Sequence, residues 1–396
     1  MSKHGRILVA MSGGIDSSLA AVMLHEEGYE VIGMTMKTWD YASSGGTKKE
    51  TGCCSLDSIN DARNIAVSLG FPHYILDIRE EFGDAVIDHF TGEYLEGRTP
   101  NPCVMCNTHI KWDALLRRAD RLDCESIATG HYAHIREEGN RFVLSKGVDT
   151  LKDQSYVLWG VSQESLSRTK LPLGHLRKSE IRDMATERGF MELVTKSESY
   201  EICFVPDNDY RGFLKRRMPG LEAEVAGGNF VMEGTGKVLG KHQGYPFYTI
   251  GQRKGLGMAF GQPMFVTEIR KETNEVVLGV DRDLYRDGMI VSKLNLQKYP
   301  TLNGPMETVT KVRYKDPGTA ATISQTGDKI EVLFEEGVSA IAPGQAAVFY
   351  EGDDVIGGGW IMKSFRRSDG RQGDEFTRSD SYKETAAHPQ LTANSL

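Results

Sequence analysis

The chain has 396 residues, of which 39% are hydrophobic and 26% charged, a composition typical of a soluble globular protein with two or three domains. No stretch reaches the ~20 apolar residues of a membrane span and the N-terminus leaves no room for a signal peptide, which predicts a cytoplasmic protein without a membrane partner. The net charge of −8 argues against indiscriminate nucleic-acid binding, and six cysteines are too few for a disulfide scaffold.

Strand-like and helix-like segments alternate through the first half of the chain. Apolar periodicity and terminal glycines predict strands at 6–11, 30–36, 73–78 and 126–129, and helices at 17–27, 58–69, 80–89 and 109–119. Alternation of this kind is typical of right-handed crossovers in a parallel sheet. The sequence therefore predicts an α/β fold with a doubly wound parallel sheet, whose ligands gather at the carboxyl ends of the strands.

The pattern changes after about residue 206. A short basic helix is predicted at 210–218, short antiparallel strands at 247–250 and 263–269, and a β-rich stretch at 291–365. The polar end of the chain has no periodicity, as in a disordered tail. We expect an N-terminal α/β domain at 1–206, a small central β-rich domain at 207–288, a C-terminal β domain at 289–366 and a tail at 367–396.

One segment links the first predicted strand to the first predicted helix and carries two adjacent glycines. It reads Ala10-Met11-Ser12-Gly13-Gly14-Ile15-Asp16-Ser17. Glycines let backbone N–H groups approach a di- or triphosphate at a helix N-terminus. The G-x-x-x-x-G-K-[ST] motif is absent from the sequence, and with it the lysine clamp of ordinary ATPases and kinases. The segment resembles the PP-loop of ATP pyrophosphatases, which split ATP between its α- and β-phosphates. Met36, Gly130 and His131 are expected at the same edge of the sheet.

Two widely separated cysteines, Cys106 and Cys203, favour sulfur chemistry. Cys106 lies in the run 100–106, whose two prolines predict a rigid, extended loop that holds out a thiol. An adenylating loop with two thiols favours sulfur transfer, in which one thiolate carries a persulfide and the second releases the product or closes a disulfide. Three other cysteines, Cys53, Cys54 and Cys124, are interpreted as small buried hydrophobes, although the unusual pair Cys53-Cys54 leaves another role for these two open.

Several motifs in a fixed order carry a more specific resemblance. They are A-M-S-G-G-I-D-S-S, T-P-N-P-C-V-M-C-N, A-T-G-H-Y-A, K-D-Q-S-Y, E-I-C-F, V-R-Y and A-P-G-Q-A. Together, over residues 6–360, they resemble the tRNA-specific 2-thiouridylases (tRNA-uridine 2-sulfurtransferases). The resemblance implies ATP-dependent replacement of the 2-oxygen of the wobble uridine by sulfur in tRNAs for Lys, Glu and Gln. It also implies a PP-loop domain, a small central domain and a C-terminal antiparallel β-barrel.

The resemblance further implies roles for individual residues. Cys106 is the catalytic nucleophile and Cys203 the persulfide carrier. The ATP contacts are Ala10, Met11, Ser12, Gly13, Gly14, Ile15, Asp16, Ser17, Met36 and Gly130. The target base is met by Asn101, Pro102 and Cys103. Other tRNA contacts are His131, Lys152, Asp153, Gln154, Arg313, Tyr314 and Gln345. Lys152 carries a positive charge that the phosphate loop lacks, and Tyr314 offers a stacking face beside a cation.

Cys103 departs from the family pattern, because many members carry Asp at this position. A thiol is a poorer acid–base group at neutral pH unless its pKa is shifted. Three interpretations stay open. Cys103 is a neutral variant, or it resolves a Cys106–Cys203 disulfide by exchange, or the three thiols ligate an iron–sulfur cluster, for which they supply only three thiolates.

The predicted reaction starts with ATP on the loop and Mg²⁺ neutralising its phosphates. The uracil 2-oxygen attacks the α-phosphorus, and a persulfide on Cys203, loaded by a cysteine desulfurase or a sulfur-relay protein, delivers sulfur. Cys106 either attacks the persulfide or receives the resulting disulfide. Two other classes remain open, a PP-loop synthetase that adenylates another substrate and a non-catalytic tRNA-binding protein with a relic loop. Basic runs, each interpreted alone as solvated surface, are Arg177-Lys178 with Arg182, Lys215-Arg216-Arg217, Arg253-Lys254 and Lys311 to Lys315.

Overall fold

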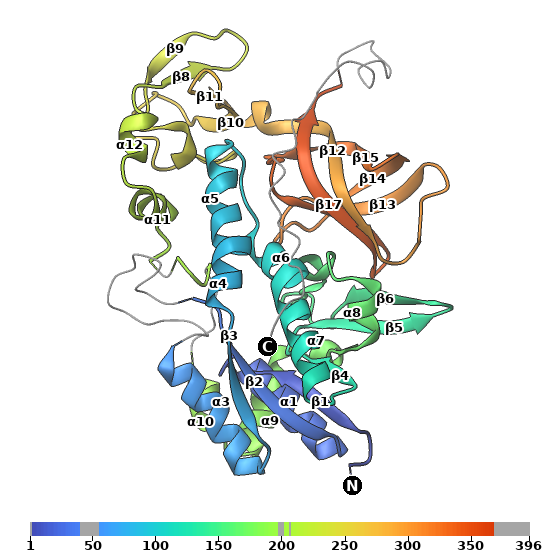
Figure 1. The fold of residues 1–396 in the computed structure, drawn as a ribbon. Helices are drawn as coiled ribbons and strands as arrows, with labels where there is room; N and C mark the ends of the chain where they lie inside the picture. The colour runs from blue at the N-terminus through green and yellow to red at the C-terminus, as the bar shows by residue number, and fades with distance from the viewer. Residues whose placement is uncertain (1, 40–54, 197–201, 206, 368–396) are drawn as a thin grey trace, which may run out of the picture.

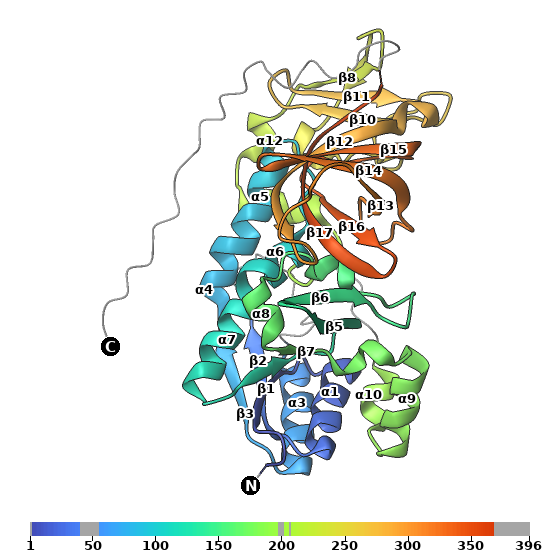
Figure 2. The same cartoon turned by 90° about the vertical axis from the view of Figure 1, so that its right-hand side faces the viewer.

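The N-terminal part of the chain is built on a five-stranded parallel sheet, at the base of the molecule in Figures 1 and 2. The computed structural model describes residues 2–39, 55–196, 202–205 and 207–367. The strand order of this sheet is β3-β2-β1-β4-β7. Its strands are β1 (Arg6–Ala10), β2 (Glu30–Lys37), β3 (His73–Asp77), β4 (Ser126–Ala128) and β7 (Thr169–Lys170).

Helices cover both faces of this sheet, which confirms the predicted doubly wound fold. Because side chains alternate along a strand, Leu8 lies in one buried cluster while Ile7 and Val9 lie in another. The cluster of Leu8 includes residues of α7 (Trp112–Arg121). The other cluster includes residues of α1 (Ile15–Glu27), α3 (Leu56–Leu69), α9 (Lys178–Glu187) and α10 (Met191–Thr195). Helices α1 and α3 end at the predicted glycines, Gly28 and Gly70.

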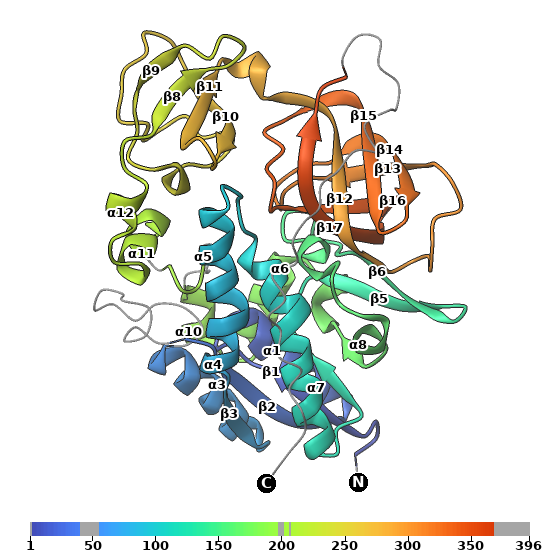
Figure 3. The ribbon, with the colours of Figure 1, turned by 45° about the horizontal axis from the view of Figure 1, so that its top comes forward.

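Two composite helices connect the sheet to the rest of the molecule (Figure 3). One joins α4 (Arg79–Phe82), the π-helical turn η1 (Gly83–Ile87) and α5 (Asp88–Leu95). The other joins α6 (Pro102–Cys106), the π-helical turn η2 (Asn107–Lys111) and α7. The helices predicted at 80–89 and 109–119 are therefore shorter than the composite helices of the structure.

The extended loop predicted to hold out a thiol before Cys106 is wrong. Asn101 is the N-cap of α6, and its side chain accepts a hydrogen bond from the N–H of Val104 at 3.3 Å. Pro102 occupies the first helical position, where its fixed φ and missing N–H suit a helix start. The prolines therefore begin a helix at this point, and both Cys103 and Cys106 are helical residues.

A hairpin, which the sequence pattern did not predict, leaves the N-terminal part and joins the barrel sheet. It consists of β5 (Ala133–Glu138) and β6 (Arg141–Lys146). It is followed by η3 (Ser155–Leu158), α8 (Gln163–Ser167) and η4 (Pro172–His175). Strand β6 pairs with a barrel strand through Ser145 and Asp354.

The central part packs a four-stranded sheet and two helices on α5 (Figure 3). Its strand order is β10-β11-β8-β9. The elements are α11 (Tyr210–Arg217), α12 (Leu221–Glu224), β8 (Asn229–Met232), β9 (Val238–Lys241), η5 (Tyr245–Phe247), β10 (Phe265–Arg270) and β11 (Glu275–Gly279). The strand predicted at 247–250 is wrong. Phe247 and Tyr248 are buried at a 3₁₀ turn, and Pro246 cannot donate to a strand ladder.

The last part is a closed six-stranded antiparallel barrel, which confirms the predicted C-terminal architecture. Its strand order is β12-β15-β14-β13-β16-β17, and β12 pairs with β17 to close it. After η6 (Asp281–Leu284) come β12 (Tyr285–Leu296), β13 (Met306–Lys311), β14 (Thr319–Thr326), β15 (Lys329–Ser339), β16 (Ala346–Glu351) and β17 (Asp354–Phe365). The predicted tail, apart from Arg367, lies outside the described residues. Within the described ranges no helix is long and apolar enough to cross a membrane.

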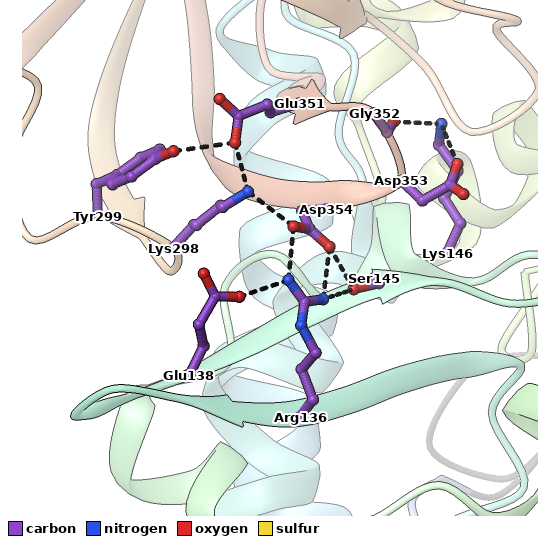
Figure 4. Close-up of polar contacts among 10 residues, drawn as sticks. All are labelled: Arg136, Glu138, Ser145, Lys146, Lys298, Tyr299, Glu351, Gly352, Asp353 and Asp354. Atoms are coloured by element: carbon purple, nitrogen blue, oxygen red, sulfur yellow. Dashed lines mark hydrogen bonds and ion pairs between the residues drawn. The ribbon is translucent and has the colours of Figure 1, made fainter.

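Charged side chains join the hairpin to the barrel (Figure 4). The Asp354 carboxylate accepts hydrogen bonds from both terminal nitrogens of Arg136, at 2.6 and 2.7 Å, and from Ser145 Oγ at 2.7 Å. Lys298 Nζ lies 2.7 Å from the same carboxylate and also binds Glu351. The Asp354 side chain is only 15% exposed. These hydrogen bonds, Arg136 first, lower the pKa of Asp354.

We expect Asp354→Asn to destabilise the protein by about 2 kcal/mol, because it leaves the mostly buried Lys298 and the more exposed Arg136 without their shared negative charge. Since the folded pKa of Asp354 is lowered, its stabilisation is present above the ordinary carboxyl pKa of about 4 and is lost as pH falls through the folded value. Chemical denaturation at pH 7 and pH 3 measures both effects. The variant and the parent should differ less at pH 3.

Glu138→Gln provides the matched control, because Glu138 contacts the same Arg136 but is 55% exposed. An exposed ion pair contributes at most about 1 kcal/mol, so this variant should unfold close to the parent. Equal losses in the two variants would contradict the special role of Asp354.

Candidate active site

Hydrogen bonds from Ser12 and Ser17 fold the loop between β1 and α1 back on itself. The Ser12 N–H donates to Ser17 Oγ at 3.0 Å, and Ser17 Oγ donates to the Gly14 carbonyl at 3.2 Å. Gly13 has φ +68°, and a Cβ there would lie 1.9 Å from the carbonyl oxygen of Ser58. Gly14 is the N-cap of α1 and has no side chain to bind the first N–H groups of that helix. The loop therefore has the form of an anion cradle.

The ends of this loop are anchored in the core. Met11 is 2% exposed and its N–H donates to the Met34 carbonyl at 2.8 Å, while Ile15 is 7% exposed. Ala10 ends β1. Of the three polar side chains of the loop, that of Ser12 is exposed, that of Asp16 half-buried and that of Ser17 buried.

Gly130 and Met36 lie where the parallel sheet was expected to place them. A Cβ on Gly130 would lie 2.7 Å from the Ser17 nitrogen and 2.8 Å from the Asp16 carbonyl carbon, so the chain after β4 touches the loop. Met36, near the end of β2, packs on two buried clusters. Both residues are thus at the carboxyl edge of the sheet, as the sequence predicted.

Two lysines that the loop motif did not reveal contact the loop. Lys178 Nζ lies 2.7 and 2.8 Å from the Asp16 carboxylate oxygens, and the Tyr132 hydroxyl donates to the same carboxylate at 2.6 Å. Lys196 Nζ donates to the Gly13 carbonyl at 3.0 Å and forms an ion pair with Asp61.

Lys178 begins α9 and is 7% exposed. Its interpretation as part of a solvated basic run is wrong, because the fold buries it against an acidic loop residue. In the sequence, only the basic run Arg177-Lys178 could have drawn attention to Lys178 as a residue of this site.

Cys103 occupies the second position of α6, next to the predicted base-binding residues Asn101 and Pro102. Its side chain is solvent-accessible, yet neighbouring protein atoms crowd it enough to raise its pKa, an effect that the charge of Lys111 opposes. A thiol with a raised pKa is protonated at neutral pH. Cys103 in this state is a hydrogen-bonding neighbour of the site and a poor base.

Cys106 and Cys203 belong to the same hydrophobic region of the fold. Cys106 is 6% exposed and belongs to a buried cluster against which Cys203 packs. The residue after Cys203, Phe204, meets Phe82 and Phe90 edge to face at 5.8 and 5.1 Å, which holds this segment beside α4 and α5. Cys106 immediately precedes the π-helical turn η2, a kind of irregularity that is frequent at functional sites.

The remaining cysteines differ from this pair. Cys124 is 3% exposed, and burial raises its pKa to about 11, so its interpretation as a small buried hydrophobe is confirmed. Cys53 and Cys54 lie outside the described residues. Across the described ranges, no group of three or more His, Cys, Asp or Glu side chains is arranged to hold a metal ion.

His131 is a neutral hydrogen-bonding group. Burial, with a smaller contribution from the charge of Lys111, lowers its pKa to about 3. Its Nδ1 lies 2.7 Å from the hydroxyl of Thr129. The charge of Lys111 also acts on Cys103, so His131 and Cys103 share one electrostatic environment although they come from different elements.

The predicted tRNA-contact run 152–154 is partly engaged within the protein. Asp153 is 8% exposed and its carboxylate accepts from the N–H groups of Gly147 and Ser155, at 3.2 and 3.1 Å. The Gln154 side-chain oxygen accepts from the Tyr132 N–H at 3.0 Å. Lys152 is half-buried. Backbone N–H groups that donate to the side chains of Asp153 and Gln154 therefore fix the chain beside Lys152.

The C-terminal barrel contributes two of the predicted tRNA-contact residues, Arg313 and Tyr314. Tyr314 is 40% exposed; burial raises its pKa, and the charges of Asp153, Lys152 and Cys103 act on it. Arg313 donates to the Ser339 carbonyl at 3.0 Å.

Gln345 links the barrel to the start of α6. Its amide donates to the carbonyls of Thr99 and Pro100 at 3.2 and 2.8 Å, and the Thr99 N–H donates to the Pro343 carbonyl at 2.8 Å. The predicted tRNA contacts from both ends of the chain thus meet near Cys103.

Three protein-family models match successive parts of the chain. A tRNA methyl transferase HUP domain matches residues 5–207, a tRNA methyl transferase PRC-barrel domain matches 211–280, and an aminomethyltransferase beta-barrel domain matches 286–361.

Curated relatives match the chain over most of its length. A tRNA-specific 2-thiouridylase MnmA of Cytophaga hutchinsonii is 74% identical over 368 residues, which are 93% of this chain and 100% of the relative. Proteins of the same name are 71% identical in Amoebophilus asiaticus, covering 92% of this chain and 97% of the relative, and 57% identical in Salinibacter ruber, covering 91% and 95%.

Among solved structures, a 4-thiouridine synthetase in complex with RNA and ATP is 18% identical, with a TM-score of 0.35, over 55% of this chain and 51% of that one. An NMN synthetase from Francisella tularensis is 16% identical, with a TM-score of 0.32, over 54% of this chain and 75% of that one.

Proposed function

We propose, because the chain belongs to the family of tRNA-specific 2-thiouridylases, that it replaces the 2-oxygen of a tRNA wobble uridine by sulfur at the expense of ATP. The observation that carries the proposal is the shared buried cluster of Cys106 and Cys203 in a chain that also builds a phosphate cradle. The proposed domains are 1–206 for adenylation and sulfur transfer, 207–288 as the central domain, 289–366 as the barrel and 367–396 as a tail. The proposed location is the cytoplasm, where tRNA is modified.

The first proposed step uses the loop at residues 10–17. The uncapped N-terminus of α1 and the glycine backbone bind the phosphates of ATP, and Met36 and Gly130 line the same edge. Mg²⁺ bound with the nucleotide offsets the phosphate charge. The uridine 2-oxygen attacks the α-phosphorus, pyrophosphate leaves, and an adenylated base results. Lys178, 2.7 Å from Asp16, supplies the positive charge that the loop motif itself lacks.

The second proposed step moves sulfur from a persulfide on Cys203, which a cysteine desulfurase or a sulfur-relay protein provides. In one order, the terminal sulfur attacks C2 of the base and AMP leaves; the Cys106 thiolate then attacks Sγ of Cys203 and frees 2-thiouridine. In the other, Cys106 attacks Sγ of Cys203 first and releases hydrosulfide, which attacks C2 of the base and displaces AMP. Both orders end in a Cys106–Cys203 disulfide, which a thiol reductant must reduce before the next turnover.

The target base is proposed to enter between α6 and the barrel. Asn101, Pro102 and Cys103 start α6 on one side, and Tyr314 with Arg313 provide a stacking face and a cation on the other. Tyr314 lies within electrostatic range of Cys103, which supports this arrangement. His131, uncharged, contributes hydrogen bonds without repelling a cation nearby.

Incubation with tRNA, ATP and a persulfide donor, followed by nucleoside analysis, tests the function. We expect 2-thiouridine at the wobble position and AMP and pyrophosphate in equal amounts. Pyrophosphate release that does not depend on tRNA would favour a synthetase acting on another substrate. Binding of tRNA without any pyrophosphate release would favour a non-catalytic binding protein.

Replacing Lys178 by Gln is expected to lower ATP-dependent pyrophosphate release about 100-fold or more, a loss on the scale of one removed electrostatic contact in a catalytic site. The loop would keep its glycines but lose the cation that neutralises Asp16. Arg177→Gln, an exposed change one residue away, is the matched control and should retain activity. ATP binding by a folded Lys178→Gln protein with parental affinity and turnover would contradict this assignment.

A further inference from the structure

A cavity in the central part of the chain takes no part in the proposed reaction. It has a volume of about 590 Å³ and opens between the start of α11 and the segment that follows η5. Tyr210 and Arg211 line one side, and Thr249, Gln252 and Lys254 line the other. None of its lining residues belongs to the phosphate loop, and its Tyr210 packs against the hydrophobic cluster that also contains Cys106.

Ion pairing distinguishes the cations at and beside this cavity from the three at the end of α11. Lys215, Arg216 and Arg217 each form an ion pair with an acidic side chain, namely Glu222, Asp207 and Asp88. Arg253 and Lys254 are exposed, and within the described part of the chain neither forms an ion pair. The positive charge of this pair is therefore not neutralised by a described acidic neighbour.

The acidic member of the cavity wall is already engaged. Asp209 is the N-cap of α11 and accepts a hydrogen bond from the Gly212 N–H at 2.9 Å. Its carboxylate therefore serves the helix start, and the basic side chains dominate the opening.

Aromatic rings hold Arg211 in place at the cavity. Its guanidinium lies 5.3 Å from the ring centre of Tyr248 and 6.0 Å from that of Tyr210, and it donates to the Gly255 carbonyl at 3.3 Å. The Tyr210 hydroxyl is buried and has no hydrogen-bond partner within the described ranges. A guanidinium held in position in this way suits an anion with several acceptor oxygens.

The cavity wall also touches the barrel near the proposed base site. A Cβ on Gly251 would lie 2.9 Å from Cβ of Ala340, so the segment that carries Arg253 and Lys254 rests on the barrel. The preceding residue of the barrel, Ser339, accepts the hydrogen bond from Arg313. The basic pair is thereby connected, through one barrel turn, to a residue proposed to contact tRNA.

We propose that this central cavity, lined by Arg211 and Lys254 and flanked in the chain by the exposed Arg253, binds phosphates of the tRNA backbone outside the target nucleotide. The inference rests on the proposed function and adds a second contact region to it. A chain with a net charge of −8 needs such a local cluster of unpaired cations to hold a polyanion. We favour a phosphate backbone over an acidic protein partner, because the separate cationic side chains at this cavity suit the oxygens of successive phosphates.

Binding of unmodified tRNA to the full chain, measured over a series of salt concentrations without a sulfur donor, tests the inference. We expect Arg253→Gln and Lys254→Gln each to weaken binding several-fold and to reduce the slope of log K against log salt by about 0.7–0.9, the value for one phosphate contact. Turnover at saturating tRNA should stay at the parental value. Lys237→Gln, an exposed lysine in the β8–β9 turn outside the cavity, is the matched control and should bind as the parent does.

Parental affinity and salt slope in both cavity variants would overturn the inference, even if the protein makes 2-thiouridine. Parental tRNA binding combined with slower transfer from a sulfur-carrying protein would also overturn it and would assign the surface to that protein. A parent chain that makes no 2-thiouridine but loses tRNA affinity in these variants would instead refute the proposed function and leave the tRNA-binding cavity standing.

Discussion

Replacing Cys203 by serine is expected to abolish 2-thiouridine formation while leaving the affinity for ATP and tRNA close to the parental value. Serine cannot carry a persulfide, and Cys203 packs at the edge of its cluster, so the substitution removes little packing. Nucleoside analysis after incubation with tRNA, ATP and the donor measures the loss. Pyrophosphate release should continue, because adenylation precedes sulfur delivery.

Cys106→Ser distinguishes the two orders of sulfur transfer when no free thiol is added. If the persulfide attacks the base first, the variant stalls with tRNA joined to Cys203 through a disulfide, which a reductant cleaves to release 2-thiouridine. If Cys106 acts first, the variant retains a persulfide on Cys203 and no tRNA is attached. Mass spectrometry of the protein separates these products.

Cys124→Ala is the control for loss of a thiol as such. Cys124 lies buried in a different cluster from Cys106 and Cys203, so this variant should lose some stability but keep thiolation. Thiolation retained by the Cys203→Ser protein would remove Cys203 from the mechanism.

Gly13→Ala is expected to abolish ATP binding and to destabilise the fold by about 2–4 kcal/mol. Its φ of +68° is costly for alanine, and the new Cβ would lie 1.9 Å from the backbone oxygen of Ser58, which cannot move as a flexible side chain does. The loop and the start of α3 must separate to accept it. Calorimetric ATP titration and thermal unfolding measure the two losses.

Gly14→Ala is the control that distinguishes backbone strain from hindered approach of the nucleotide to the loop. Gly14 has φ −92°, and a Cβ there would meet only Ser12 Oγ, at 3.6 Å. This variant should therefore unfold close to the parent, and any loss of ATP affinity reports how closely the nucleotide approaches the backbone. Equal destabilisation by the two alanines would contradict the argument from loop geometry.

Much of the fold could be predicted because it depends on local patterns. Apolar periodicity and the glycines at 28 and 70 located the first strands and helices, and alternating elements identified the parallel sheet. The β5–β6 hairpin was missed because its stability comes from pairing with a barrel strand distant in the sequence. The strand expected at 247–250 failed because buried apolar residues look alike in a turn and in a strand.

The candidate site shows the same division. Ordered motifs named the loop, Cys106 and Cys203, and the strand ends placed Gly130 beside the loop. The prolines before Cys103 were misinterpreted, because proline favours both an extended segment and the first position of a helix. Only the capping hydrogen bond of Asn101 decides between them.

The sequence by itself determined the reaction class expected of this protein. The phosphate loop and each of the two cysteines lie in short continuous motifs, and the chemistry of such motifs depends on residue type. The tertiary structure alone decided that Lys178 neutralises Asp16, that Gln345 hydrogen-bonds to the segment before α6, and that Arg253 and Lys254 form no ion pair with any residue that the structure describes. Ion pairs, burial and pKa shifts depend on distances between side chains that are remote in the chain. Local sequence patterns carry no record of those distances.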